Sequence, residues 1–230
     1  MKIGIVAANG KAGQLITKEA INRGLDVTAI VRNKNKTVAE KSIIKDLFDL
    51  TSEDLKPFDV IIDAFGEVRE DKLHLHQDSV HHLNKLLSNT DTRLIIIGGA
   101  GSLYVDDKLE TQLYNTPDFP ESYKPLSIAQ GKVLDDLRKR NDIRWTFVSP
   151  AAEFIADAER TGTYILAGEK VTLNDNGESK ISYADFAIAM VDEAVKGDHI
   201  KKEFQFYQNK CFSPLAFIKP RSYNEYESKR

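Results

Sequence analysis

Short apolar runs alternate with helical patterns through the first two thirds of the chain, and no other feature restricts the possible folds as strongly. The runs predict buried strands at residues 3–7, 27–31, 42–45, 60–62, 94–97 and 145–148. The helical patterns cover residues 11–23, 73–87 and 127–139. Strands that are apolar on both faces and alternate with helices are typical of a parallel sheet covered on both sides. We therefore predict an α/β fold with a doubly wound, mostly parallel Rossmann-type sheet in an α/β/α arrangement.

The pattern loosens after Pro150, where we expect a small subregion on the substrate side. Residues 162–172 predict a small hairpin, residues 183–196 a helix and residues 203–207 a late strand. The substrate-side elements therefore fall mainly within residues 150–207.

We expect residues 1–207 to form a single Rossmann-type domain, because a chain of this length fits one domain. Residues 208–230 combine prolines with many charges and little periodicity. They predict an extended or disordered tail.

The charge balance excludes some partners. The chain carries 32 basic and 35 acidic residues, a formal net charge of −3, which argues against a nucleic-acid partner. No apolar run approaches the roughly 20 residues needed to cross a bilayer, and the start of the chain reads as a strand. The single cysteine, Cys211, excludes an intramolecular disulfide and suits a reducing compartment. We expect a cytoplasmic monomer or homodimer without a membrane partner.

The stretch from Ile5 to Gly13 joins the first predicted strand to the first predicted helix through a turn of small residues. Gly10 would let the backbone approach a pyrophosphate, and Gly13 would let the helix pack closely on the strand. The start of the helix offers free N–H groups and the positive end of its dipole to an anion. An ordinary tight turn without a ligand is the alternative. The position between strand and helix favours a dinucleotide-binding loop.

A basic segment follows the second predicted strand, about 20 residues after the glycine loop, where NAD-binding chains carry an acid for the ribose hydroxyl. This sequence has Val31-Arg32-Asn33-Lys34 there instead. The planar guanidinium of Arg32 suits a 2′-phosphate, and Lys34 adds charge. A solvated basic loop is the alternative. We favour NADP(H) as the cofactor, with NAD(H) as the second candidate.

The same residues carry a resemblance to a known family. Residues 2–13 and 27–32 resemble atypical short-chain dehydrogenase/reductases, and more specifically the NAD(P)H-flavin reductases (NmrA-like) of that superfamily. Further stretches that match this group are residues 61–66, 98–103, 116–120, 145–154 and 181–185. The likeness covers about residues 1–207 and leaves the tail outside.

The resemblance implies the cofactor-binding residues loop by loop. The phosphate loop would comprise Ala7, Asn9, Gly10, Lys11, Ala12 and Gly13. The 2′-phosphate would meet Arg32 and Asn33, and the adenine would be flanked by Asp46 and Leu47. The ribose side would be lined by Ala64, Phe65 and Gly66. The nicotinamide would be framed by residues 98–102, which include Gly98 and Gly99, and by Ser149, Pro150, Ala151 and Ala152.

Two departures from the family pattern bear on the chemistry. The first glycine of the family's loop is Ala7 here, a small residue that we expect to fit. The superfamily's Tyr-x-x-x-Lys catalytic pair is absent from the expected helix, because Lys132 follows Ile128 at that spacing. Tyr104 and Lys108 have the spacing but lie too close to the fifth strand to sit on that helix. We retain Lys132 as a cofactor-binding candidate.

Ser102 and Tyr104 are the candidate catalytic residues, because both follow the fifth strand at the predicted cleft. Each would position an acceptor, although Ser102 would equally cap a turn and Tyr104 would equally pack on the surface. Glu153 would orient a ligand or remain a surface carboxylate.

Histidines cluster in the second predicted helix, and His74, His81 and His82 would share one face with Asp78. A metal site is conceivable on this spacing, but a solvated or subunit-facing helix is the better interpretation. We assign no metal.

These observations favour an NADPH-dependent oxidoreductase that passes a hydride to a flavin or a similar planar small-molecule acceptor. A flavin takes its proton from solvent, which is consistent with the missing tyrosine. A non-catalytic NADP(H)-binding redox sensor would also lack the catalytic pair. An epimerase-like or isoflavone-reductase-like enzyme ranks third, because the region after Pro150 leaves little room for a substrate domain.

Overall fold

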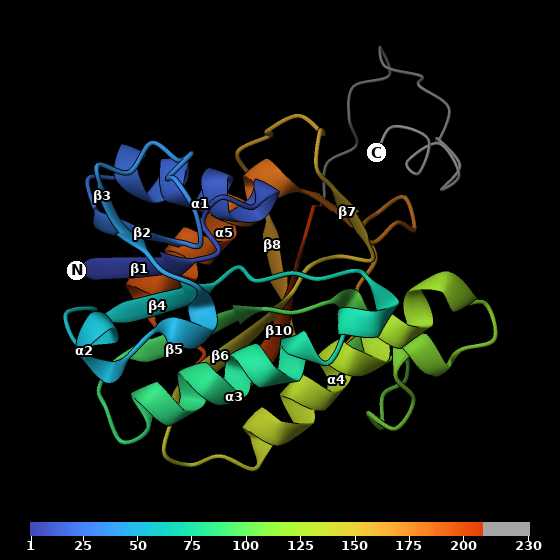
Figure 1. The fold of residues 1–230 in the computed structure, drawn as a ribbon. Helices are drawn as coiled ribbons and strands as arrows, with labels where there is room; N and C mark the ends of the chain where they lie inside the picture. The colour runs from blue at the N-terminus through green and yellow to red at the C-terminus, as the bar shows by residue number, and fades with distance from the viewer. Residues whose placement is uncertain (209–230) are drawn as a thin grey trace.

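A computed structural model describes residues 1–208 (Figure 1). The strands are β1 (Lys2–Val6), β2 (Asp26–Val31), β3 (Lys41–Ile44), β4 (Val60–Asp63), β5 (Arg93–Ile97), β6 (Arg144–Ser149), β7 (Glu153–Ile155), β8 (Ile165–Ala167), β9 (Lys180–Ser182) and β10 (Lys202–Tyr207). The α-helices are α1 (Lys11–Asn22), α2 (Ser52–Leu55), α3 (Leu75–Leu87), α4 (Lys124–Arg138) and α5 (Tyr183–Lys196).

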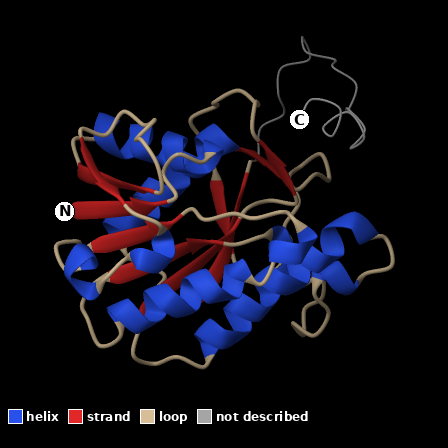
Figure 2. Ribbon diagram, viewed as in Figure 1, coloured by secondary structure: helices blue, strands red, loops and turns tan. Residues whose placement is uncertain are grey.

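The strands form an eight-stranded sheet in the order β3-β2-β1-β4-β5-β6-β10-β8. Every neighbouring pair is parallel except β10 and β8. Figure 2 shows helices on both sides of the sheet: α1 and α5 pack together on one face, and α3 and α4 on the other. The strand order reverses between β1 and β4, and ligands of such sheets bind beyond the carboxyl ends of the strands at this point. The predicted Rossmann-type α/β fold is confirmed.

Each helix packs on the sheet through an apolar stripe. In α1 the buried residues are Gly13, Ile16, Thr17 and Ala20, whereas Leu15 and Ile21 lie half-buried beside them. The pattern therefore identified the buried face of this helix. Helix α4 begins at Lys124, three residues before the predicted start at 127, and Pro125 occupies its first turn. Proline suits this position because it has no N–H that the helix would need to pair.

The hairpin predicted for residues 162–172 is wrong. Only Ile165–Ala167 forms a strand there, and this strand, β8, pairs antiparallel with β10 at the edge of the main sheet. Asp185 in the first turn of α5 accepts hydrogen bonds from the backbone N–H groups of Thr161 and Gly162 at 3.1 and 2.8 Å. These bonds tie the start of the loop to α5, so that β8 meets β10 instead of folding back on itself.

A second, two-stranded sheet joins β7 and β9 in parallel, and the sequence patterns did not predict it. Its strands are only three residues long, too short for an alternation to register. The sheet lies directly after β6, because only three residues separate β7 from the end of β6 at Ser149. It therefore belongs to the same edge as the predicted nicotinamide loops.

No helix within residues 1–208 has the length and apolar character of a membrane span. The tail predicted for residues 208–230 lies, from residue 209 onwards, outside the described residues, as does Cys211.

Candidate functional site at the carboxyl edge of the sheet

The carboxyl ends of the parallel strands bring most of the predicted site residues to one edge of the sheet. The loop after β1 carries residues 7–13, and the loops after β2 and β3 carry Arg32, Asn33, Asp46 and Leu47. Ala64, Phe65 and Gly66 follow β4, and Gly98 and Gly99 follow β5. Ser149 ends β6 and leads into Pro150 and Ala151. Because these strands are parallel neighbours, their loops share a single edge.

The glycine loop turns directly from β1 into α1. The Gly10 N–H donates to the Ala7 carbonyl at 2.9 Å, and Gly10 is the N-cap of α1 without a side-chain cap. Among residues 1–208, no acceptor meets the backbone N–H groups of Lys11, Ala12 and Gly13. No acidic side chain lies in this first turn either. The helix therefore presents unpaired donors and the positive end of its dipole, as an anion site requires.

Gly13 permits the close approach of α1 to β1. A Cβ at this position would lie 2.8 Å from both the Ala7 carbonyl oxygen and the Ala8 Cα, and 2.9 Å from the Ala8 carbonyl oxygen. All three are backbone atoms, so a side chain could be accommodated only by moving the loop itself. This is the packing role that the sequence pattern predicts for the last glycine of the motif.

Ala7 adopts a positive φ of 55°, in the left-handed region where glycine has no penalty. The residue that replaces the family's first glycine thus holds the conformation that glycine favours. The fit expected for Ala7 is therefore obtained with local backbone strain of about 1 kcal/mol.

Asn9 joins the glycine loop to the basic segment after β2. Its Nδ2 donates to the Lys34 carbonyl at 3.0 Å, and its Oδ1 accepts from the Lys36 N–H at 2.8 Å. Arg32 is exposed, and its guanidinium has no hydrogen-bond or ion-pair partner among the described residues. The side chain of Asn9 is thus committed to structural bonds, which hold the backbone of the segment after β2 against the glycine loop.

The loops after β3 and β4 are shaped by aspartates. Asp46 accepts from the Phe48 N–H at 3.1 Å and begins a short 3₁₀ turn that buries Leu47. Asp63, at the end of β4, accepts from the Phe65 N–H at 3.0 Å. Burial raises the pKa of Asp63 to about 6, although this hydrogen bond acts in the opposite direction. Asp63 lies in the stretch 61–66 that resembles the family, but the sequence does not indicate that its carboxyl group is buried.

The glycines after β5 serve close packing. A Cβ at Gly98 would lie 2.1 Å from the Phe147 ring, and one at Gly99 would lie 2.0 Å from the Gln130 side chain. The Gly98 N–H also donates to the Val148 carbonyl at 2.9 Å, which holds the start of this loop beside β6. A side chain at Gly98 would have to displace the Phe147 ring, whereas one at Gly99 would have to displace only the end of the Gln130 side chain.

The structure gathers Ser102, Tyr104 and Ser149 around two residues that sequence reasoning missed, Glu203 of β10 and Arg138 of α4. Ser102 and Ser149 donate to Glu203 Oε1 at 2.7 and 3.0 Å. Arg138 donates to Glu203 Oε2 at 3.2 Å and to the Tyr104 hydroxyl at 3.3 Å. Sequence separates Glu203 from Ser102 by 101 residues, and the one available signal was an acid inside an apolar strand pattern.

This arrangement corrects the direct catalytic role expected for Ser102. Its side chain is buried, with 1% of the residue exposed, and its hydroxyl is taken up by Glu203. Tyr104 is half-buried and bonded to Arg138, so its hydroxyl is also engaged. Burial raises the pKa of Glu203 to about 7, while the bonds from Ser102 and Ser149 and the charge of Arg138 lower it.

The remaining candidates lie on other elements. Lys132 is exposed on α4, and two residues correspond to a turn of about 200° round the helix from Gln130, which lies beside Gly99. Glu153 is exposed on β7. Tyr104 and Lys108 lie in the loop that precedes α4 and not on that helix. The cofactor-binding role of Lys132 therefore stays a prediction.

The histidines of α3 make separate contacts. His81 lies 3.1 Å from an Asp136 carboxylate oxygen, and His82 lies 3.1 Å from the Leu50 carbonyl. His76 is buried 2.8 Å from the Glu67 carbonyl, and burial lowers its pKa. Within residues 1–208 no group of three or more histidine, cysteine, aspartate or glutamate side chains is placed to hold a metal ion.

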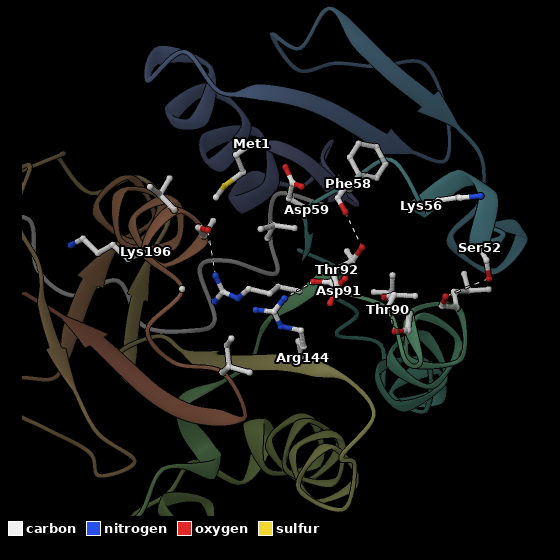
Figure 3. A pocket seen from close by; sticks show the side chains of 18 of the residues that line it. Met1, Ser52, Lys56, Phe58, Asp59, Thr90, Asp91, Thr92, Arg144 and Lys196 are labelled. Atoms are coloured by element: carbon white, nitrogen blue, oxygen red, sulfur yellow. Dashed lines mark hydrogen bonds between the residues drawn. The ribbon is translucent and has the colours of Figure 1, made fainter.

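A hollow lies at the opposite edge, where the strands begin (Figure 3). Its volume is about 800 Å³, and Lys56 and Lys196 lie on opposite sides of it with Arg144 between them. Asp59 and Asp91 add negative charge to the lining, and Arg144 donates to the Asp91 carbonyl at 2.8 Å. The lining mixes both signs of charge, and the buried Arg93 Nε in it has no hydrogen-bond partner. The hollow lies at the amino ends of the strands, whereas ligands of such sheets bind beyond the carboxyl ends.

Comparison with known proteins identifies the family of the chain. Residues 7–194 match the model of a family described as NAD(P)H-binding. A structure from Streptococcus pneumoniae TIGR4, called a "putative NADH-flavin reductase", is 54% identical, with a TM-score of 0.89, and the match covers 90% of this chain and 99% of that one. An uncharacterized protein of Bacillus subtilis, YwnB, is 47% identical over 89% of this chain and 97% of its own length.

A third relative carries a different description. The structure of a "putative epimerase" from Bacteroides thetaiotaomicron is 32% identical, with a TM-score of 0.79, and the match covers 92% of this chain and 99% of that one. Together these similarities confirm the family resemblance that the sequence motifs predict.

Proposed function

The chain belongs to the NAD(P)H-binding family, and from this premise we propose that it is an NADPH-dependent oxidoreductase that reduces a flavin or a similar planar acceptor. The observation that carries the proposal is that Asn9 connects the basic segment after β2 to the loop that precedes α1. This residue holds the basic segment after β2 beside the unpaired N–H groups of α1. A dinucleotide with two separate phosphate groups matches such an arrangement.

The described residues fit this cofactor on chemical grounds. The N–H groups of Lys11, Ala12 and Gly13 would bind the pyrophosphate, and the free guanidinium of Arg32 would bind the 2′-phosphate as a charge-assisted pair. Phe65 and Gly66 after β4 would line the ribose side. The bound cofactor would supply the hydride.

The remaining work of the protein is to orient the reactants and to exclude water. The loops after β5 and β6 would do this, because they are packed without room for a further side chain at Gly98 and Gly99. No tyrosine stands four residues before Lys132, where Ile128 lies, and Lys132 itself points to solvent. An acceptor that takes its proton from water suits a site without such an acid.

The experiment is a calorimetric titration with NADPH and NADH, followed by an NADPH-oxidation assay with FMN and FAD. We expect NADPH to bind more tightly than NADH. We also expect NADPH to be oxidised when a flavin is present as the acceptor of its hydride. Absence of NADPH binding would contradict the proposal at its base. NADH binding that equals or exceeds NADPH binding would remove the role given to Arg32.

A non-catalytic NADP(H)-binding redox sensor is the second candidate. The observation that favours it is the isoleucine at position 128, since a sensor needs no catalytic acid. The same assay separates the two functions. Tight NADPH binding without oxidation in the presence of any flavin would favour the sensor, whereas sustained turnover would exclude it.

A further inference from the structure

A buried carboxylate connects the two loops that would frame the nicotinamide. Glu203 Oε1 accepts hydrogen bonds from Ser102, in the 3₁₀ turn after β5, and from Ser149, at the end of β6. Glu203 comes from β10, which lies beside β6 on the side away from β5. Its carboxylate therefore links the loop after β5 and the end of β6 to the strand β10.

Glu203 is held on its other side by a single cation. Its side chain is fully buried, and Arg138, whose side chain is 30% exposed, donates to Oε2 at 3.2 Å. Arg138 also donates to Glu169 at 2.7 Å and lies 5.9 Å from the centre of the Tyr104 ring. Burying a carboxylate is costly unless it is paired and hydrogen-bonded, and these contacts provide both.

We propose that Glu203 is a positioning residue of the reductase site, which sets the relative placement of the loops after β5 and β6 through Ser102 and Ser149. The inference rests on the proposed function, because it assigns a role in hydride transfer. Ser102 would then act through the loop that it anchors, and not by touching the acceptor.

The charge of Glu203 gives this arrangement a pH dependence that a purely structural residue would lack. Burial raises the pKa of its carboxyl to about 7. The charged or titratable groups that face it among the described residues are Arg138 of α4, Glu169 of the loop after β8, and Tyr104 beside Arg138. The ionised carboxylate accepts from both serines, whereas protonation removes charge from the bond to Arg138 and acceptor capacity from the serines.

The test compares Glu203→Gln with a matched control, Glu193→Gln. Glu193 is also buried and paired with an arginine, Arg93, at 2.6 Å, but this pair lies at the opposite edge of the sheet. NADPH affinity is measured by calorimetry, and kcat and KM for FMN are measured from pH 6 to pH 8.5. We expect Glu203→Gln to lower kcat about ten- to a hundred-fold while NADPH affinity stays near that of the wild type.

The pH profile separates positioning from loss of stability. In the wild type, kcat should change across a pKa near 7, and this change should be absent in Glu203→Gln but present in Glu193→Gln. The Ser149→Ala variant keeps the ion pair between Arg138 and Glu203, and we expect it to lower kcat as well. This variant tests the proposal if Glu203→Gln does not fold.

Failure of the inference and failure of the proposed function give different results. A wild type that oxidises NADPH, together with Glu203→Gln and Ser149→Ala variants of unchanged kcat and pH profile, would overturn the inference alone. A wild type that does not bind NADPH, or binds it without passing a hydride to any flavin, would overturn the reductase function and this inference with it.

Discussion

Two buried arginine–glutamate pairs lie at opposite ends of the sheet, and they differ in what they hold. Arg93 pairs with Glu193 at 2.6 Å and also donates to the Glu193 and Ala194 carbonyls, which closes the last turn of α5. Glu193 in turn lies 2.7 Å from the His199 ring. The Arg138–Glu203 pair instead contacts hydroxyl groups on two loops. The same pair of side chains therefore secures a helix end at one edge and links loops at the other.

The two edges of the sheet also differ in their hollows and in their unpaired polar groups. The hollow of about 800 Å³ lies beside Arg93, whereas the carboxyl edge carries the unpaired N–H groups and the free guanidinium of Arg32. The volume of a hollow does not tell what a ligand would gain on binding there. The unpaired N–H groups of α1 would gain hydrogen bonds from an anion, and strand polarity also favours the carboxyl edge.

The strongest test of the carboxyl edge is Gly13→Ala. Its Cβ would meet backbone atoms at 2.8 Å, so we expect a loss of about 2–3 kcal/mol in unfolding free energy and loss of NADPH binding. Gly168→Ala is the control, since a Cβ there would meet no atom within 4 Å. Urea denaturation and calorimetry measure the two effects. Equal stabilities of the two variants would contradict the close packing described for α1.

Two arginine variants compare the edges directly. Arg32→Ala should weaken NADPH binding roughly ten- to a hundred-fold and leave NADH binding almost unchanged, because a charge-assisted bond contributes about 1.5–3 kcal/mol. Arg144→Ala, in the lining of the large hollow, should change neither affinity. Both are read by calorimetry at one salt concentration, since phosphate contacts weaken with salt. The reverse pattern would move the site to the amino edge.

Stability should respond to pH through Glu203. Because burial raises its pKa to about 7, the folded chain holds this proton more tightly than the unfolded chain. The resulting stabilisation is present below the unfolded pKa and is lost as pH rises through about 7. We expect the urea midpoint to fall between pH 5 and pH 8 by less in Glu203→Gln than in the wild type. The difference between the two isolates Glu203 from His76, whose lowered pKa acts in the opposite direction. A parallel response of both proteins would refute this assignment.

The smallest expected effect concerns Ala7. Its positive φ favours glycine, so Ala7→Gly should stabilise the chain by about 0.5–1 kcal/mol, less the greater entropy of glycine in the unfolded state. A thermal unfolding midpoint below that of the wild type would show that the strain at Ala7 is negligible. NADPH affinity of the variant would tell whether the methyl group affects the phosphate loop.

Local patterns predicted the elements that depend on local physics. The apolar run before Gly10 and the stripe of α1 define a strand and a helix within a few residues, and the loops follow from strand polarity. The Asn9 bridge to Lys34 and Lys36 was beyond such reasoning, because it depends on how two loops meet in space. The positive φ of Ala7 was not predicted either, because alanine at this position indicates only that a small residue fits.

Long-range pairing accounts for the remaining differences. The strand β8 joins β10 across the sheet edge, and no alternation within residues 162–172 distinguishes that pairing from a hairpin. The sequence predicts Glu203 only as part of a strand, and its hydrogen bond with Ser102 depends on the tertiary fold. Lys132 is exposed on α4, and its spacing from Ile128 does not tell whether its side chain reaches a cofactor.

Calorimetric titration of NADPH into the wild type, Arg32→Ala and Arg144→Ala decides whether a nicotinamide dinucleotide binds at the carboxyl edge. We expect one NADPH per chain, a weakened affinity in Arg32→Ala and an unchanged affinity in Arg144→Ala. An absence of binding, or binding that Arg144→Ala abolishes and Arg32→Ala preserves, would contradict a site at this edge.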